Sequence, residues 1–233
     1  MIDIILVEPE KAGNIGAIAR VMKNFEFSNL VLINPKVNHL DIEAVQRAKH
    51  GNDILKKAKV KDFNYLKQYD YRIATTAKIG TDYNIPRNVM SLEQFGKKLS
   101  EINTKKVKIA ILIGREGLGL TNYEIKQADF TVAIPTSKKY PTLNISHSVA
   151  IILYEIYKNL KVEKDIDKII PISKKEKEII LKKINKILNK LEFTTKEKKE
   201  TQKIVWKRLI GKAMLTKREA FALLGFLKKL EKD

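Results

Sequence analysis

The sequence predicts an α/β domain with a largely parallel sheet, followed by a small, strongly basic helical extension. Over residues 1–160, short apolar runs alternate with longer segments whose apolar residues recur at helical spacing. Residues 161–233 hold 22 basic and 11 acidic residues and three Ser/Thr-x-x-Glu sequences of the kind that begin helices. We therefore expect a first domain over residues 1–160, a linker over 161–172 and a basic helical extension over 173–233.

Strands and helices are expected to alternate along the first domain. The segment Ile2–Val7 is almost continuously apolar, as expected for a strand that is buried on both faces. The expected strands are Ile2–Val7, Leu30–Ile33, Tyr71–Ala77, Lys108–Ile113 and Thr131–Ile134. The expected helices are Gly13–Phe27, Asp41–His50, Ser91–Ile102, Thr121–Gln127 and Ile145–Leu160.

The basic extension is expected to form a bundle of about three helices, because capping-box sequences recur between amphipathic stretches. The three expected helix starts are Ser173/Glu176, Thr194/Glu197 and Thr216/Glu219. The apolar positions at helical spacing are Ile180, Ile184, Ile187, Leu188 and Leu191, and later Phe221, Leu224 and Leu227.

The charge of the chain indicates a polyanionic partner. Lys and Arg number 46 against 27 Asp and Glu, which leaves a formal net charge of +19. A coding bias that favours Lys would exchange Arg for Lys, but it would not by itself create a surplus over the acids. RNA or DNA is therefore expected ahead of an anionic membrane surface.

Several classes of protein are disfavoured by composition. The absence of cysteine excludes a disulfide scaffold, a thiolate metal site and a cysteine nucleophile. The three histidines are scattered in sequence, so no metal site is expected. The start MIDIILVEPE lacks the pattern of a signal peptide, and no apolar run approaches the length of a membrane span. We expect a cytoplasmic protein that does not contact the membrane.

A first candidate site lies in residues 7–20, where a strand ends, a loop with Gly13-x-x-Gly16 follows and a helix begins near Ile15. This is not the Gly-x-Gly-x-x-Gly sequence of a dinucleotide fold, which disfavours a nicotinamide enzyme. Asn14 at the start of the helix and Arg20 in its first turns suit a phosphate group. Taken alone, however, Arg20 could equally be a surface residue of an amphipathic helix.

A second candidate site lies in residues 112–129. A strand runs into Gly114, Gly117 and Gly119, which let the backbone approach a ligand closely. Arg115 and Glu116 then stand at the carboxyl end of the strand, where open α/β sheets bind their ligands.

A third candidate site lies in residues 134–155. A basic loop with an aromatic residue, formed by Lys138, Lys139 and Tyr140, precedes Thr142 and Asn144 at the start of a helix. Tyr140 could stack on a base, although a single loop tyrosine is weak evidence, and Asn144 also suits helix capping.

The three segments together resemble the three motifs of the SPOUT-superfamily RNA ribose methyltransferases. The motifs are Asn-x-Gly with a following Arg, then Gly-Arg-Glu-Gly-x-Gly-Leu-Thr-Asn, then Leu-Asn-x-Ser, in that order. Within the superfamily, the chain is most similar to the TrmJ type of tRNA 2′-O-methyltransferase over residues 1–160.

The resemblance implies a sheet whose C-terminal segment forms a trefoil knot, S-adenosylmethionine bound by loop backbone, and a homodimer with the active site at its interface. It also implies methylation of the ribose of the first anticodon-loop nucleotide of tRNA. The residues that it assigns to cofactor binding are Thr75, Thr76, Ala77, Gly114, Glu116, Ile134, Thr142, Leu143 and Asn144. It assigns catalysis to Arg20 with Asn14 and Glu116. We expect RNA to be bound by Arg20, Arg115, Lys138, Lys139 and Tyr140.

One departure concerns the third motif, because Pro141 and Thr142 stand where bacterial members often carry Ser-Ser. Pro141 stiffens the loop, while Thr142 keeps a hydroxyl. Three alternatives stay open: a ribosomal RNA target, another tRNA position, and an RNA-binding protein without catalysis. The sequence does not distinguish cytidine from uridine as the target base.

Overall fold

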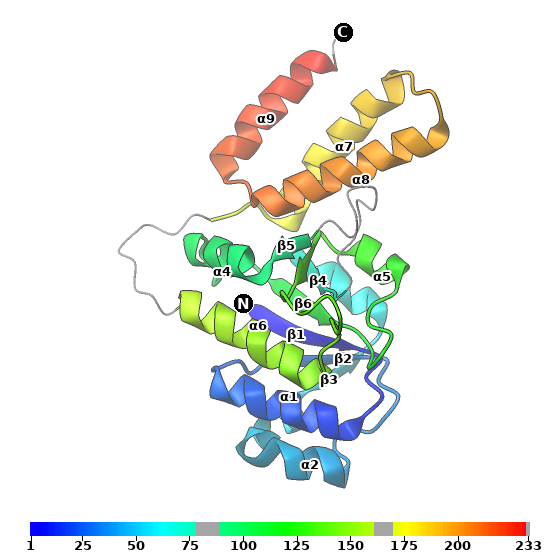
Figure 1. The fold of residues 1–233 in the computed structure, drawn as a ribbon. Helices are drawn as coiled ribbons and strands as arrows, with labels where there is room; N and C mark the ends of the chain where they lie inside the picture. The colour runs from blue at the N-terminus through cyan, green and yellow to red at the C-terminus, as the bar shows by residue number, and fades with distance from the viewer. Residues whose placement is uncertain (78–88, 161–169, 232–233) are drawn as a thin grey trace.

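The computed structural model describes residues 1–77, 89–160 and 170–231 and consists of a parallel sheet, helices on both its faces and three C-terminal helices (Figure 1). The seven described strands pair in the order β3-β2-β1-β6-β4-β7-β5, and every pairing is parallel. Their bounds are β1 Ile2–Val7, β2 Leu30–Ile33, β3 Lys59–Lys61, β4 Tyr71–Thr75, β5 Val89–Ser91, β6 Ile109–Ile113 and β7 Phe130–Ala133.

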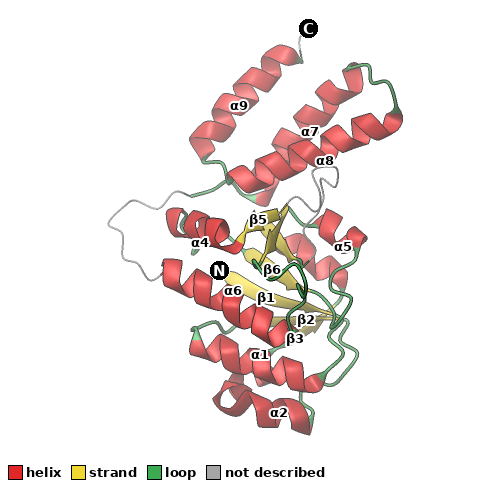
Figure 2. Cartoon of the chain, in the orientation of Figure 1, coloured by secondary structure: helices red, strands yellow, loops and turns green. Residues whose placement is uncertain are grey.

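Where the structure describes the connections, helices link consecutive strands, as a parallel sheet requires (Figure 2). Their bounds are α1 Ala12–Asn24, α2 Ile42–Ala48, α3 Asn52–Lys57, α4 Leu92–Glu101, α5 Asn122–Gln127 and α6 Ile145–Leu160, with short 3-10 helices η1 Lys49–Gly51 and η2 Phe63–Gln68.

The inner strands of the sheet are buried on both faces, because helices cover both sides and neighbouring residues of a strand point to opposite sides. Ile4 and Leu6 of β1 pack in the cluster that includes α1, α4 and α6, whereas Ile5 and Val7 pack in the cluster that includes η2 and α5. This two-sided burial explains the continuous apolar runs of the inner strands.

The predicted α/β class with a largely parallel sheet is confirmed, and so is the presence of C-terminal helices. Two strands were missed because neither carries a strong apolar signal. The edge strand β3 has the sequence Lys-Val-Lys and is exposed throughout, and β5 is only three residues long. Lysines at a sheet edge also hinder pairing with a second sheet.

Helices α7 Lys174–Lys190, α8 Lys196–Ala213 and α9 Lys217–Leu230 form the C-terminal extension. The capping boxes predicted at Ser173 and Thr216 are present, but the one predicted at Thr194 and Glu197 is wrong. The hydroxyl of the next residue, Thr195, accepts the hydrogen bond from the backbone N–H of Lys198, so α8 begins one residue later than expected.

The extension has its own apolar cluster, and the predicted face of α7 contributes Ile180, Ile184 and Leu188 to it. The predicted apolar positions Leu191 and Phe221 are instead exposed, Phe221 to 71%. Of the predicted linker, residues 161–169 lie outside the described residues, and Ile172 is fully buried in the cluster of the extension.

The extension packs against the amino ends of β4 and β7. Lys177 Nζ donates a hydrogen bond of 2.8 Å to Asp129 Oδ1 and lies 3.8 Å from the ring centroid of Tyr71. The Tyr71 hydroxyl in turn donates to the carbonyl of Ile172 at 2.9 Å. The carboxyl ends of the strands are therefore left free for a ligand, and α7–α9 lie at the opposite end of the molecule from α2 (Figure 1).

Candidate functional site

A pocket opens at the carboxyl ends of β4, β6 and β7, which are neighbours in the sheet. Its walls come from the segments that follow these strands, from the segment that precedes α6, and from apolar side chains of α4 and α6. Of the nine residues expected to bind the cofactor, seven line this pocket: Thr75, Thr76, Ala77, Gly114, Ile134, Thr142 and Leu143. Glu116 and Asn144 do not line it.

The loop after β6 is folded back on itself, and its glycines permit this shape. Gly117 and Gly119 have φ values of 81° and 70°, which L side chains rarely adopt. A Cβ on Gly114 would lie 2.1 Å from the carbonyl carbon of Gly119, so the two limbs of the loop touch there. Arg115 and Gly119 also exchange backbone hydrogen bonds.

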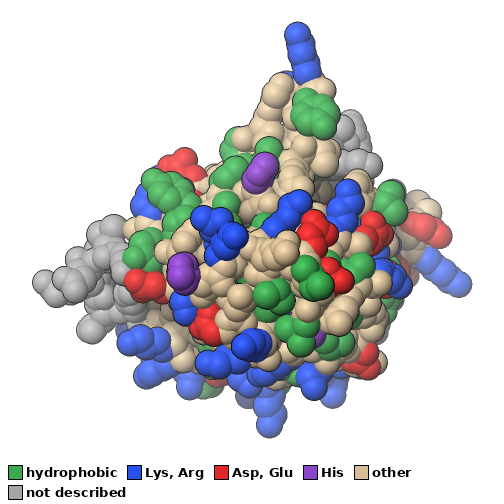
Figure 3. Space-filling model, turned by 90° about the horizontal axis from the view of Figure 1, so that it is seen from below, with side chains coloured by type: hydrophobic (Ala, Val, Ile, Leu, Met, Phe, Trp, Pro, Cys, Tyr) green, Lys and Arg blue, Asp and Glu red, His purple; other side chains and the backbone are tan. Residues whose placement is uncertain are grey.

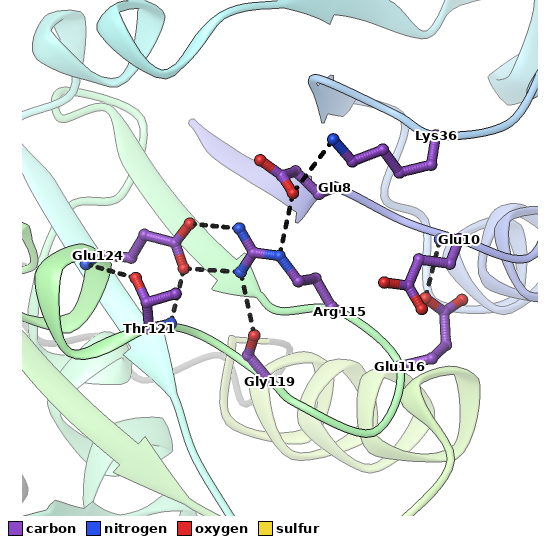
Figure 4. A network of polar contacts seen from close by, with 8 residues as sticks. All are labelled: Glu8, Glu10, Lys36, Arg115, Glu116, Gly119, Thr121 and Glu124. Atoms are coloured by element: carbon purple, nitrogen blue, oxygen red, sulfur yellow. Dashed lines mark hydrogen bonds and ion pairs between the residues drawn. The ribbon is translucent and has the colours of Figure 1, made fainter.

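Arg115 holds this loop through two carboxylates (Figure 4). Its Nη1 and Nη2 donate to Glu124 at 3.0 and 2.8 Å, and its Nε donates to Glu8 at 3.1 Å. Nη1 also donates to the carbonyl of Gly119 at 3.3 Å. The side chain is only 11% exposed, so these contacts are shielded from solvent.

The electrostatics of this network favour the charged forms of all three side chains. Burial opposes the charge of Glu124, but the hydrogen bonds from Arg115 and Thr121 outweigh it, and the pKa of Glu124 is lowered. The hydrogen bond from Arg115 also lowers the pKa of Glu8, and the carboxylate of Glu124 raises the pKa of Arg115. The network is therefore a fully ionised cluster at neutral pH.

The role that the sequence suggested for Arg115, contact with RNA, stays a prediction, because nothing in the structure tests it. The structure assigns it a positioning role that sequence reasoning missed. Its partner Glu124 also closes a capping box with Thr121 at the start of α5. One carboxylate oxygen, Oε2, accepts both from Thr121 N at 2.7 Å and from Arg115 Nη1. Glu8 carried no sequence signal, since it lies 107 residues from Arg115.

A chain of hydrogen bonds joins the three predicted motifs. Asn14 Nδ2 donates to Glu116 Oε1 at 3.0 Å, and Asn144 Nδ2 donates to Asn14 Oδ1 at 3.3 Å. Ser146 Oγ donates to Asn144 Oδ1 at 2.7 Å, and Glu116 Oε2 accepts from the backbone N–H of Glu10 at 2.9 Å (Figure 4). Asn14 is buried in this chain, so its amide is oriented from both ends.

Arg20 lies on the exposed side of α1 and lines a second concave surface, together with Ser146 and His147 of α6. Within the described ranges, no side chain forms an ion pair or hydrogen bond with Arg20. Ser146 connects this surface to the chain of Asn144 and Asn14. Arg20 therefore lies beside the hydrogen-bond chain of Asn144 and Asn14, which we call the polar chain. It does not line the pocket that contains most of the predicted cofactor residues.

The loop with Lys138, Lys139 and Tyr140 is exposed, and Tyr140 is 80% accessible to solvent. The Thr136 hydroxyl donates to the carbonyl of Pro141 at 3.0 Å and closes the base of the loop beside the pocket. These three side chains are available to an external ligand, and their assignment to RNA stays a prediction.

Two structural features are absent from the residues that the structure describes. None of the helices in these parts of the chain combines the length and apolar character that crossing a bilayer requires. The same residues contain no group of three or more His, Asp or Glu side chains that could hold a metal ion.

Comparison with known proteins places this geometry in context. The model of the SpoU rRNA Methylase family matches residues 1–154. A tRNA (cytidine-2′-O-)-methyltransferase TrmJ from Methanocaldococcus jannaschii is 39% identical over 231 residues, which are 98% of this chain and 99% of the relative.

Two solved structures extend the comparison to the fold. The crystal structure of TrmJ from Z. mobilis ZM4 has a TM-score of 0.69 at 27% identity, and the match covers 99% of both chains. An rRNA methyltransferase from Sinorhizobium meliloti, solved with AdoMet bound, has a TM-score of 0.53 at 20% identity and covers 68% of this chain and 56% of its own. The latter likeness concerns the fold alone.

Proposed function

The chain belongs to the SpoU rRNA methylase family, and from that premise we propose that it transfers a methyl group from S-adenosylmethionine to a ribose 2′-hydroxyl of tRNA. The observation that carries the proposal is that three motifs, far apart in sequence, are joined by one chain of hydrogen bonds, and that the second and third of them also line the pocket at the carboxyl edge of the sheet. The full-length similarity to a tRNA (cytidine-2′-O-)-methyltransferase supports tRNA as the substrate. The proposed target is the first anticodon-loop nucleotide, a cytidine or a uridine, and the proposed compartment is the cytoplasm.

The residues of the pocket fit S-adenosylmethionine. Leu92, Ile113 and Ile152 offer an apolar wall for an adenine ring, and the surrounding segments are loops that present backbone groups. The two limbs of the loop touch at Gly114 and leave no room for a side chain there, and Gly114, Gly117 and Gly119 line the pocket without side chains. We propose that Thr75, Thr76, Ala77, Gly114, Ile134, Thr142 and Leu143 hold the cofactor, with Glu116 and Asn144 contributing from the adjoining polar chain.

The cofactor supplies an activated methyl group, because its sulfur carries a positive charge. The protein must then position the ribose hydroxyl and favour loss of its proton. In our proposal, Asn14 and Glu116 form a preoriented polar pair beside the pocket, and Asn144 fixes the amide of Asn14. The ribose is held against this pair.

Arg20 acts electrostatically rather than as a base, because a guanidinium stays protonated at any ordinary pH. Its exposed side chain is available to grip the phosphate next to the target ribose and to favour the developing alkoxide. A phosphate oxygen or a water molecule then accepts the proton.

A homodimer with the active site at its interface is part of the proposal. The outer surface of α6 exposes Tyr154 to 54%, together with Ile151, next to the concave surface that contains Arg20. A second copy on this face would cover these apolar groups and would place the concave surface that contains Arg20 at the dimer interface. We also propose that the segment after β7 is threaded as a trefoil knot.

The test is transfer of labelled methyl from S-adenosylmethionine to an unmodified tRNA transcript, followed by nuclease digestion to place the label. Label as a 2′-O-methyl group on the first anticodon-loop nucleotide supports the proposal. Label on ribosomal RNA or at another tRNA position supports the proposed methyl transfer but contradicts the proposed target nucleotide. No transfer to either RNA contradicts the proposed function.

A further inference from the structure

Three glycines bring α2 and the turn after it directly against α1. A Cβ on Gly16 would lie 2.1 Å from the carbonyl oxygen of Ala44, and a Cβ on Gly51 would lie 2.7 Å from the carbonyl oxygen of Ala19. A Cβ on Gly13 would similarly meet the side chain of Glu43. Because no side chain separates these backbones, residues 47–51 are held next to Arg20.

The turn that follows α2 carries Lys49 in a conformation that suits glycine. Lys49 has φ 49° and ψ −120°, a combination that L residues rarely adopt. The close contact of Gly51 with the backbone of Ala19 and Arg20 fixes this turn. Non-glycine residues in such conformations persist where the surroundings determine them, and they are concentrated at functional sites.

Arg20, Arg47 and Lys49 line one concave surface, and no acidic side chain lines it with them. Arg47 has an ion pair with Glu43 at 3.1 Å, but both side chains are more than half exposed and such a pair is weak. Within the parts of the chain that the structure describes, Arg20 and Lys49 have no ion-pair partner. Three like charges in one concavity repel one another unless an anion joins them.

The surface adjoins the proposed reaction site, because Ser146 lines it and also donates to Asn144 in the polar chain. Figure 3 views the molecule from the side of α2 and shows Lys and Arg side chains spread over this face. An anion bound between these cations would therefore lie next to the ribose that the site is proposed to methylate.

We propose that Arg20, Arg47 and Lys49 form a binding site for successive phosphodiester groups of the RNA strand, and that Lys49 is a positioning residue that fixes the strand relative to the target ribose. This inference rests on the proposed function. It adds two cations that neither the motifs nor the family resemblance indicated, and it gives a reason for a lysine in a turn whose backbone suits glycine.

The test compares Lys49→Gln and Lys49→Gly with the wild-type protein in two assays. The first is the affinity for an unmodified tRNA transcript over a series of salt concentrations. Loss of one phosphate contact should reduce the slope of log affinity against log salt by about 0.7–0.9. The second is methyl transfer, for which KM for RNA should rise about fivefold or more, while the affinity for S-adenosylmethionine stays the same.

The variants also separate this role from a structural one. Lys49→Gly relieves the backbone strain, so its Tm should not fall below the wild-type value even though its RNA binding weakens. Lys49→Arg keeps the charge and should recover most of the slope. Asn34→Gly is the matched control for strain, since Asn34 also has a positive φ of 45° but does not line the concave surface. It should leave the slope unchanged.

An unchanged slope and KM in Lys49→Gln would overturn the proposal. That failure is distinct from failure of the proposed function, because RNA binding is measured without turnover. If the wild-type protein binds tRNA with the predicted loss in Lys49→Gln but transfers no methyl group, the phosphate site stands and the catalytic assignment fails.

Discussion

Replacing Arg115 with lysine should loosen the loop that forms one wall of the cofactor pocket. Arg115 makes three hydrogen bonds to the carboxylates of Glu8 and Glu124, and it anchors the carbonyl of Gly119 with a fourth. A lysine keeps the positive charge, but its single ammonium group cannot reproduce the fork that engages both carboxylates.

The magnitude follows from the number and burial of the lost contacts. Lysine can keep about one of the three charge-assisted bonds, and each of the two lost bonds costs about 1–1.5 kcal/mol. With Arg115 11% exposed and Glu124 8% exposed, little solvent reaches the site. We expect a loss of about 2–3 kcal/mol of unfolding free energy, which lowers Tm by roughly 5–10 °C.

The assay is thermal unfolding of Arg115→Lys and wild type, combined with calorimetric titration of S-adenosylmethionine. The dissociation constant of the cofactor should rise about tenfold, because the loop at Gly114 is no longer held in place. The control is Arg218→Lys on α9, where the arginine is exposed, and its Tm should stay within about 1 °C of wild type. An unchanged Tm and cofactor affinity in Arg115→Lys, with weaker RNA binding, would refute the positioning role and favour the RNA contact.

Three further predictions concern the reaction, the extension and pH. Arg20→Ala should reduce kcat by about 100-fold or more while cofactor affinity, measured by the same titration, stays nearly intact; an equal loss of cofactor affinity would mean that the site is assigned wrongly. Replacing the exposed Lys196 and Lys198 of α8 by glutamine should weaken tRNA binding and reduce its salt slope by roughly 1–2, and an unchanged slope would limit the extension to a structural role. Because the pKa of Glu124 is lowered below its ordinary value of 4.5, its stabilising effect should be present above that value and lost as pH falls through the lowered pKa. The decline of Tm between pH 6 and about pH 3 should therefore be shallower in Glu124→Gln than in wild type, and equal declines would contradict the assignment.

Strong periodicity made most of the fold predictable. Strand β1 and helix α6 coincide with the expected ranges Ile2–Val7 and Ile145–Leu160, because each has an apolar pattern several residues long. The edge strand Lys59–Lys61 has no such pattern and is fixed by its pairing with β2, which depends on residues about thirty positions away. The position of the extension depends on the pair Lys177 and Asp129, and local patterns carry no information about that pair.

The candidate site was predictable where the motif residues lie in loops that follow strands. The carboxyl ends of β4, β6 and β7 meet at one edge, so Thr75, Gly114 and Ile134 converge on one pocket. The role of Arg115, by contrast, could not be predicted from the sequence. Its two carboxylate partners come from different segments, and whether a motif arginine binds RNA or holds a loop depends on those partners.

The central claim is that the protein methylates a ribose 2′-hydroxyl in tRNA, and the most direct test removes that hydroxyl. A tRNA with a single 2′-deoxynucleotide at the first anticodon-loop position is compared with the all-ribose molecule. Transfer of label from S-adenosylmethionine is measured for both, and the affinity of the protein for each RNA is measured in parallel. Incorporation of label should be abolished in the 2′-deoxy molecule, while binding of the RNA should be retained. Incorporation at the wild-type level into the 2′-deoxy molecule would contradict the central claim.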